Sequence, residues 1–286
     1  MGKFYNVSEL KKNVYRIDSN EQVFMDLFVG SEKALLWDTG YGYGDLKAVV
    51  REITDLPLII VNSHGHLDHT CGNFQFEEDI YIHPADVELC QQHNSLEMRK
   101  GAVENGRHTF MYETGQLMDV LPEDFDEERY VNAGYGKLVP VEEGHVFDLG
   151  GITLEVVEVP GHTHGSIGLL YKEEKIFFAG DAMNPFLWLF APEATMLSEY
   201  KATLRKADGL DFEALVVSHG PGALPKAILA DFMDAAENVD YEKGFPFQTP
   251  LFPGLEARIC AREGFTPADM GKPGFASVVI SKEHID

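Results

Sequence analysis

Four side chains of metal-ligand type occur within six consecutive residues, in the segment HGHLDH at positions 64–69. The segment directly follows LPLIIVNS, whose continuous apolar run is typical of a strand buried on both faces, and it precedes the turn-like residues TCGN. Imidazoles and a carboxylate packed this closely would repel protons and lose hydration unless a cation joined them. The segment therefore predicts a metal site in a loop at the end of a buried strand.

The spacing of these side chains points to two ions. His64 and His66 are two residues apart, so in an extended segment they share a face and can bind one ion. Asp68 and His69 follow the turn and can point at a second ion. Each ion needs further ligands, and three more candidates stand where a strand runs into a loop: His162 in VEVPGHTHGS, Asp181 in IFFAGDA and His219 in LVVSHGPG.

The combination of these motifs resembles the metallo-β-lactamase superfamily. It consists of H-x-H-x-D-H, a distant GHTxGS, an Asp after an apolar strand and a final SHG, and the preceding LLWDTG resembles the family's early strand and its Asp. The motifs extend from Asp38 to His219. The resemblance implies an α/β fold, a four-layer αββα sandwich whose ligands lie on loops at one edge of two sheets.

The resemblance also implies how the ligands are shared between the ions. One ion would be bound by His64, His66 and His162, and the other by Asp68, His69 and His219. Asp181 would bridge them, because a carboxylate can offer one oxygen to each ion.

Two further positions relate to this pattern. Asp38 would accept a hydrogen bond that fixes the orientation of a ligand. His164 stands where many members of the family have Pro, and it is either an additional polar group at the pocket mouth or a surface residue.

Two close divalent ions lower the pKa of a shared water toward neutrality and stabilise an oxyanion. The expected function is therefore a hydrolase that uses a metal-bridging hydroxide on a small ester, thioester, lactone or phosphoester. Asp68 is the candidate catalytic residue, because its carboxylate can orient the hydroxide or take its proton. Zinc is the expected metal, with iron and manganese as alternatives. An iron-dependent oxidoreductase similar to persulfide dioxygenases and a non-catalytic metal-binding protein are the alternative functions.

The charge of the chain bears on its partners. The 23 Lys and Arg against 47 Asp and Glu give a formal net charge of -24, which repels phosphate backbones and anionic lipid surfaces. We therefore expect a small-molecule substrate and neither nucleic acid nor a membrane as a partner, while the oligomeric state stays open. The first residues contain no apolar signal core, and three cysteines are too few and too scattered for a disulfide framework, so we expect a cytoplasmic protein.

A hydrophobic content of 44% predicts a globular chain, and we expect residues 1–286 to form a single domain of this fold. The stretch 95–136 is less regular and is predicted to be an insertion on the pocket side. A C-terminal extension begins at about residue 245. Phe186, Trp188 and Phe190 follow Asp181 closely, and they either line an apolar pocket or belong to the core.

Overall fold

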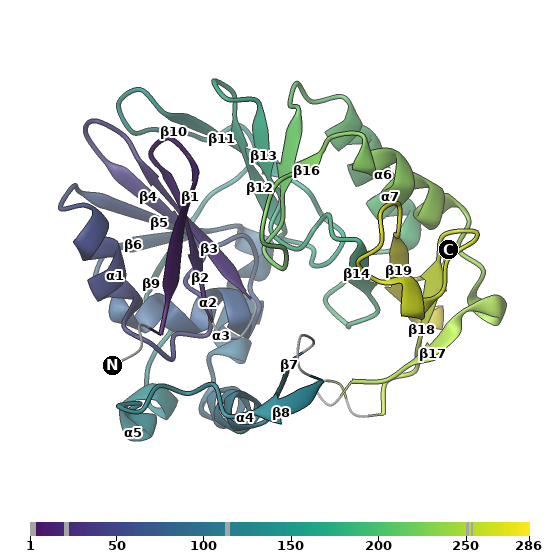
Figure 1. The fold of residues 1–286 in the computed structure, drawn as a ribbon, viewed down its shortest axis with the longest axis horizontal. Helices are drawn as coiled ribbons and strands as arrows, with labels where there is room; N and C mark the ends of the chain where they lie inside the picture. The colour runs from purple at the N-terminus through teal and green to yellow at the C-terminus, as the bar shows by residue number, and fades with distance from the viewer. Residues whose placement is uncertain (1–3, 20–22, 112–114, 250–251, 253) are drawn as a thin grey trace. The chain divides into compact units, whose positions relative to one another are not determined.

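The computed structural model describes residues 4–19, 23–111, 115–249, 252 and 254–286, and the chain divides into two compact units (Figure 1). The first unit contains residues up to Leu154 together with Ser218–Pro221. The second contains Glu155–Val217 and Gly222–Asp286. The prediction of a single domain stays a prediction.

A seven-stranded sheet is the frame of the first unit. Its antiparallel part is the meander β1 (Asn6–Lys11), β2 (Val14–Asp18), β3 (Phe24–Val29) and β4 (Ala34–Trp37). Its parallel part continues from β4 with β5 (Leu58–Val61), β6 (Asp79–Ile82) and β9 (Lys137–Pro140). Trp37 pairs with Val61, so the loops that follow β4 and β5 leave the same edge of this sheet.

Helix α1 (Leu46–Ile53) covers one face of this sheet. It begins at Asp45, whose carboxylate accepts a hydrogen bond from the Ala48 N–H at 2.9 Å. Leu46 and Val50 lie four residues apart, on one side of the helix, and both are buried against Leu36 and other core residues of the sheet. The apolar spacing that predicts this helix therefore also determines which of its sides faces the core.

The stretch 95–136 contains more regular structure than the sequence suggests. It forms α4 (Leu96–Arg107), β7 (Thr109–Met111), β8 (Gln116–Met118) and α5 (Glu127–Val131), and 112–114 lie outside the described residues. Gly101 and Gly106 weaken the helical pattern of α4, because glycine is a poor helix former. Ala102 and Val103 nevertheless pack into one cluster with Tyr130, so tertiary contacts stabilise the helix.

Arg99 of α4 anchors this stretch to the loop after the histidine motif. Its side chain is fully buried, and its Nη2 lies 2.6 Å from Asn94 Oδ1, 3.0 Å from the Gly134 carbonyl oxygen and 3.1 Å from the Cys71 carbonyl oxygen. Its guanidinium also lies over the ring of Tyr130, 4.9 Å from the centroid. A single cation therefore satisfies acceptors from segments that are far apart in the sequence.

We expect Arg99→Ala to lower the free energy of unfolding by about 3 kcal/mol, because it leaves the buried Cys71 carbonyl and Asn94 Oδ1 without this donor. Chemical denaturation measures the change. Lys100→Ala, at the exposed neighbouring position, is the control and should change stability by less than about 0.5 kcal/mol. Equal stability of the two variants would contradict the anchoring role.

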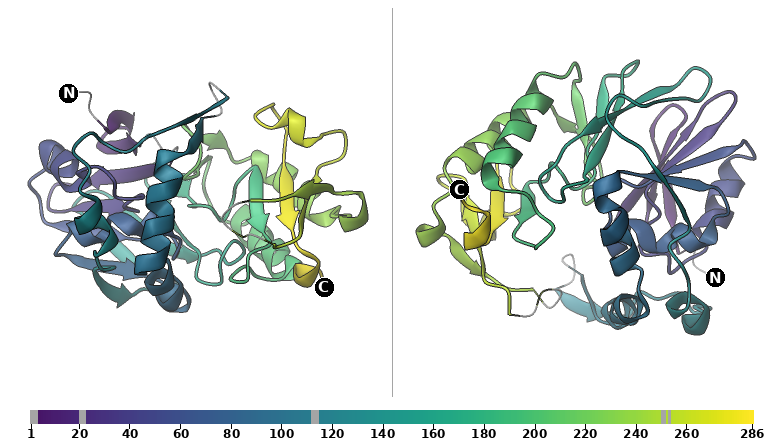
Figure 2. Two further views of the ribbon diagram at one scale, coloured as in Figure 1. Left: turned by 90° about the horizontal axis from the view of Figure 1, so that it is seen from below. Right: turned by 180° about the vertical axis from the view of Figure 1, so that it is seen from behind.

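The second unit contains β12 (Ile167–Tyr171), β13 (Ile176–Phe178), β15 (Ala214–Val216) and β16 (Leu224–Pro225), which follow one another in this order in one sheet. β12 is preceded in that order by β11 (Thr153–Glu158), of which the residues from Glu155 on belong to this unit. β12 and β13 form a hairpin around KEEK, with Leu169 opposite Phe178. Helices α6 (Leu197–Asp208) and α7 (Ile228–Glu237) lie side by side (Figure 1, Figure 2) and bury Leu204 and Phe232 in the same core as Phe177.

The second unit also contains a four-stranded sheet, which the sequence did not predict. Its order is β14 (Phe186–Leu189), β19 (Ser277–Ile280), β18 (Ala257–Ala261) and β17 (Phe245–Phe247). β14 and β19 are parallel although about 90 residues separate them in the chain. The C-terminal extension therefore completes a sheet that begins just after Asp181, which short strands separated by Pro and Gly do not reveal.

The described helices are short, since the longest, α4 and α6, have 12 residues each. None of the helices in the described part of the chain is long and apolar enough to cross a membrane. Cys71, Cys90 and Cys260 are buried free thiols, as their number and spacing predict.

Candidate metal centre

Asp38 organises the edge of the first unit at which the histidine motif lies. It follows β4, is fully buried and has a φ of 63°, a left-handed conformation that Asp tolerates better than most residues. Its Oδ1 accepts a hydrogen bond from the Ser63 N–H at 2.7 Å, and its Oδ2 accepts one from Ser63 Oγ at 2.8 Å. Oδ2 also lies 2.9 Å from Nδ1 of His69. Asp38 therefore fixes the orientation of the His69 ring.

Asp68, His69 and His219 form one donor cluster within the first unit. Asp68 Oδ2 lies 3.5 Å from His69 Nε2 and 3.4 Å from His219 Nε2. Burial opposes ionisation of Asp68, but the neighbouring His69 and His219 hold its pKa well below its usual range. The cluster therefore presents one carboxylate and two imidazoles.

Two different elements bring these three residues together. Asp68 and His69 belong to the short helix α2 (Leu67–Thr70). His219 follows β15 by three residues, and the backbone beside it is tied to the first unit because the Phe24 N–H donates to the Ser218 carbonyl at 2.9 Å. A hydrogen bond at the start of β3 therefore holds the backbone beside His219, which lies about 150 positions after His69 in the chain.

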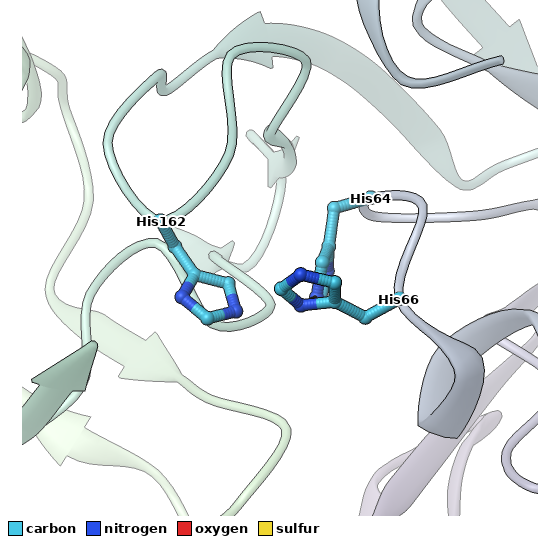
Figure 3. A group of neighbouring side chains, drawn as sticks. All are labelled: His64, His66 and His162. Atoms are coloured by element: carbon cyan, nitrogen blue, oxygen red, sulfur yellow. Dashed lines mark hydrogen bonds between the residues drawn. The ribbon is translucent and has the colours of Figure 1, made fainter. Parts of the chain in front are cut away.

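His64 and His66 present their imidazoles to each other (Figure 3). His64 Nε2 lies 3.0 Å from His66 Nδ1, and the His64 Nδ1 lies 2.9 Å from Ser63 Oγ. Both residues are buried, with 1% and 8% of their surface exposed. The motif therefore supplies a second pair of donors beside the Asp68 cluster.

His162 and Asp181 lie together within the second unit. The Nδ1 of His162, which Figure 3 also draws, is 2.9 Å from the carbonyl oxygen of Trp188. Because a carbonyl only accepts, Nδ1 carries the proton, and the ring presents Nε2 as its acceptor nitrogen. Nε2 lies 3.9 Å from Asp181 Oδ2. The second unit therefore contains one imidazole and one carboxylate that lie close together.

The donor spacing fits divalent cations. Two nitrogens bound to one tetrahedral zinc at about 2.0–2.1 Å are roughly 3.3 Å apart. The separations of 3.0 Å between His64 and His66, and of 3.4 and 3.5 Å within the Asp68 cluster, agree with that spacing. Imidazole and carboxylate donors are also the ligand types that zinc, iron and manganese accept.

His164, predicted to be either a pocket-mouth or a surface residue, is exposed. Its backbone N–H donates a hydrogen bond to the Glu193 carbonyl at 3.1 Å. An exposed side chain agrees with both alternatives, so the role of His164 stays a prediction.

The sequence did not single out His93, which lies against the motif. It ends α3 (Val87–His93), and its ring stacks on that of His66 with 5.0 Å between centroids and 23° between planes. Its Nδ1 accepts a hydrogen bond from the Leu67 N–H at 3.2 Å, at the first residue of α2. No spacing rule could identify it, because 27 residues separate it from His66 and only the packing of α2 against α3 joins them.

We expect His93→Ala to weaken binding of Zn²⁺ about tenfold, because the variant loses the ring that stacks on His66 and the acceptor at the start of α2. Isothermal titration calorimetry measures the affinity. The control is His83→Ala, since His83 is a half-buried histidine at the end of β6 that lies outside the HGHLDH motif, and its Nδ1 accepts a hydrogen bond from the nearby Ala85 N–H. Unchanged affinity in His93→Ala would refute the supporting role.

Comparison with known proteins agrees with this geometry. Residues 21–219 match the model of the metallo-beta-lactamase superfamily. Acyl-coenzyme A thioesterase MBLAC2 of Homo sapiens is 26% identical over 217 residues, which cover 72% of this chain and 74% of that protein. Hydroxyacylglutathione hydrolase GloC of Haemophilus influenzae is 26% identical over 147 residues, which cover 49% of this chain and 58% of that protein.

A similar fold occurs in the stereoselective inverting sec-alkylsulfatase Pisa1 from Pseudomonas. Its structure has a TM-score of 0.62 and 15% sequence identity, and the match covers 82% of this chain and 42% of that one. At this identity the likeness concerns the fold alone.

The chain therefore belongs to the metallo-β-lactamase superfamily, and it has the α/β sandwich fold of that family. The predicted fold class is confirmed, and so is the prediction of a hydrolytic enzyme of this superfamily.

Proposed function

We propose that this chain is a binuclear metal-dependent hydrolase that cleaves acyl thioesters. The observation that carries the proposal is the cluster of Asp68, His69 and His219. The Nε2 atoms of both histidines lie within 3.5 Å of the Asp68 carboxylate, a spacing that suits a divalent cation. The choice of thioesters is supported by the two relatives, because one is named for acyl-coenzyme A and the other for hydroxyacylglutathione, and both names denote an acyl group on sulfur.

The proposed ligand set is the one that the sequence motifs imply. His64, His66 and His162 would hold one ion, Asp68, His69 and His219 would hold the other, and Asp181 would be a ligand shared by both. Hydrogen bonds within each unit support these roles, because the Asp38 carboxylate holds Nδ1 of His69 and the Trp188 carbonyl holds Nδ1 of His162. Zinc is the proposed metal, since it accepts imidazole and carboxylate donors in this arrangement.

Two bound divalent ions supply Lewis acidity and make a water molecule acidic enough to serve as a nucleophile near neutral pH. The residues of the chain then have separate tasks. Asp68 remains ionised, so its carboxylate can accept a hydrogen bond from the attacking water and direct it at the carbonyl carbon. His69 and His162 keep fixed tautomers because their Nδ1 atoms are committed to Asp38 and Trp188.

The leaving group also favours thioesters over ordinary esters. A thiol has a pKa of about 8.5, so a thiolate can depart near neutral pH without first receiving a proton. An alkoxide is far more basic and needs a general acid to protonate it. A site whose described side chains are mainly metal donors therefore suits a thiolate leaving group.

A substrate panel tests the proposal. We expect purified, zinc-loaded enzyme to hydrolyse acetyl-coenzyme A or S-lactoylglutathione with kcat/KM at least about tenfold above that for a γ-lactone and a phosphodiester, because a thiolate departs without a general acid. The chelator EDTA should abolish this activity, and added Zn²⁺ should restore it. Turnover of neither thioester, together with oxygen uptake on a persulfide by the iron-loaded enzyme, would favour the iron-dependent alternative.

Asp181→Ala tests the proposed bridge. The variant removes the negative charge that offsets repulsion between two adjacent dications, so metal content should fall from about two ions per chain toward about one. Inductively coupled plasma mass spectrometry measures the content, and thioesterase activity should fall with it. His83→Ala is the matched control and should retain the parent content. Two ions and normal activity in Asp181→Ala would show that this carboxylate has no bridging role.

A further inference from the structure

The four-stranded sheet of the second unit has two chemically different faces. Side chains alternate between the faces of a strand, so Leu187 and Leu189 point to one side of β14 while Phe186 and Trp188 point to the other. The leucines belong to the core that also contains Leu204 of α6 and Phe232 of α7. Helices α6 and α7 therefore pack on the leucine side of this sheet.

The opposite side carries a cluster of aromatic rings, which we call the aromatic face. Its rings are those of Phe186, Trp188, Phe190, Phe247 and Phe252, and they pack with Ala257, Ile259, Val279 and Leu255. Ring centroids lie 5.2 Å apart for Trp188 and Phe190, 5.7 Å apart for Trp188 and Phe247, and 5.8 Å apart for Phe186 and Phe247. All of its members are uncharged.

The exposure of these rings bears on the two interpretations that the sequence left open, an apolar pocket or the core. Phe190 is 2% exposed and belongs to the core. Phe186, Trp188 and Phe247 are only half-buried. Aromatic side chains offer large areas for apolar contact, so half-exposed rings that already pack on one another leave a surface suited to an apolar ligand.

The aromatic face adjoins the candidate metal centre through the backbone of one residue. The carbonyl of Trp188 accepts the hydrogen bond from Nδ1 of His162 at 2.9 Å, while the indole of the same residue lies in the aromatic face. A substrate that binds beside His162 therefore lies next to the residue that carries this indole. This continuity lies entirely within the second unit.

We propose that the aromatic face binds the aliphatic chain of an acyl thioester, which places medium and long acyl chains in the substrate class. This inference rests on the proposed thioesterase function. The acyl part of the substrate fits this face better than the carrier does. The aliphatic chain of the acyl group is apolar and is bonded directly to the thioester carbonyl carbon, whereas the carriers coenzyme A and glutathione are polar and anionic. An anionic membrane is a poor occupant, because the chain has a formal net charge of -24.

The first experiment compares decanoyl-coenzyme A with acetyl-coenzyme A. In the parent enzyme, kcat/KM for the decanoyl substrate should exceed that for the acetyl substrate at least about thirtyfold, because buried methylenes add apolar contact. Phe247→Ala should lower this ratio about tenfold. Phe186→Ala, a second variant on the same face, should also lower it, so the test does not depend on the folding of one variant.

Phe265→Ala is the matched control. Phe265 is a half-buried aromatic residue of the same unit that packs on Phe275 and lies outside the aromatic face. It should leave the ratio unchanged. An unchanged ratio in folded Phe247→Ala and Phe186→Ala variants, or an equal loss in Phe265→Ala, would overturn the proposal.

A binding measurement separates this proposal from the proposed activity. The chain has two tryptophans, and Trp37 is 1% exposed in the first unit, so Trp188 is the fluorescent reporter of the aromatic face. Decanoate should change the fluorescence saturably, acetate should not, and Phe247→Ala should weaken the response about tenfold.

The possible outcomes are distinct. Decanoate binding without thioester hydrolysis would support the apolar site and reject the proposed activity. Hydrolysis of thioesters with no fluorescence response to decanoate would support the activity and overturn the apolar site. A fluorescence change that depends on protein concentration instead of decanoate would identify a second copy of the chain as the occupant and would also overturn the proposal.

Discussion

The arrangement of the histidine motif in the first unit depends on the hydrogen bonds of the Asp38 carboxylate. A non-glycine residue at a φ of 63° costs on the order of 1–3 kcal/mol, and the surrounding structure has to compensate. Ser63 supplies two hydrogen bonds, and the Asp38 N–H donates to the Val61 carbonyl. The parallel pairing of β4 with β5 makes these contacts possible, and their consequence is a fixed imidazole at His69.

The two units use the same physical device on different ligands. In each, an acceptor fixes the proton of a histidine on Nδ1, the Asp38 carboxylate for His69 and the Trp188 carbonyl for His162. Fixing the tautomer leaves Nε2 as the nitrogen with an available lone pair, which is the requirement for a metal ligand. The anionic acceptor makes the imidazole of His69 a stronger donor to a cation than the neutral carbonyl makes that of His162.

Strand β14 shows how one short segment serves three purposes. Its leucines pack in the core beneath α6 and α7, the Trp188 carbonyl orients His162, and the rings of Phe186 and Trp188 form part of the aromatic face. The twofold alternation of a strand separates the first and third tasks onto opposite faces. The strand is held by β19, which comes from the C-terminal extension, so the extension supports both the ligand and the aromatic face.

The sequence alone determined the candidate ligands, because closely spaced histidines and carboxylates at strand ends are rare without a cation. The spacing of apolar residues within α1 also determined which side of that helix faces the core. The sequence did not reveal His93, the helix α4 or the sheet that contains β14. His93 meets His66 only because α2 packs against α3, and β14 meets β19 across about 90 residues. Local patterns report short-range preferences, whereas these contacts arise from long-range packing, which only the tertiary structure decides.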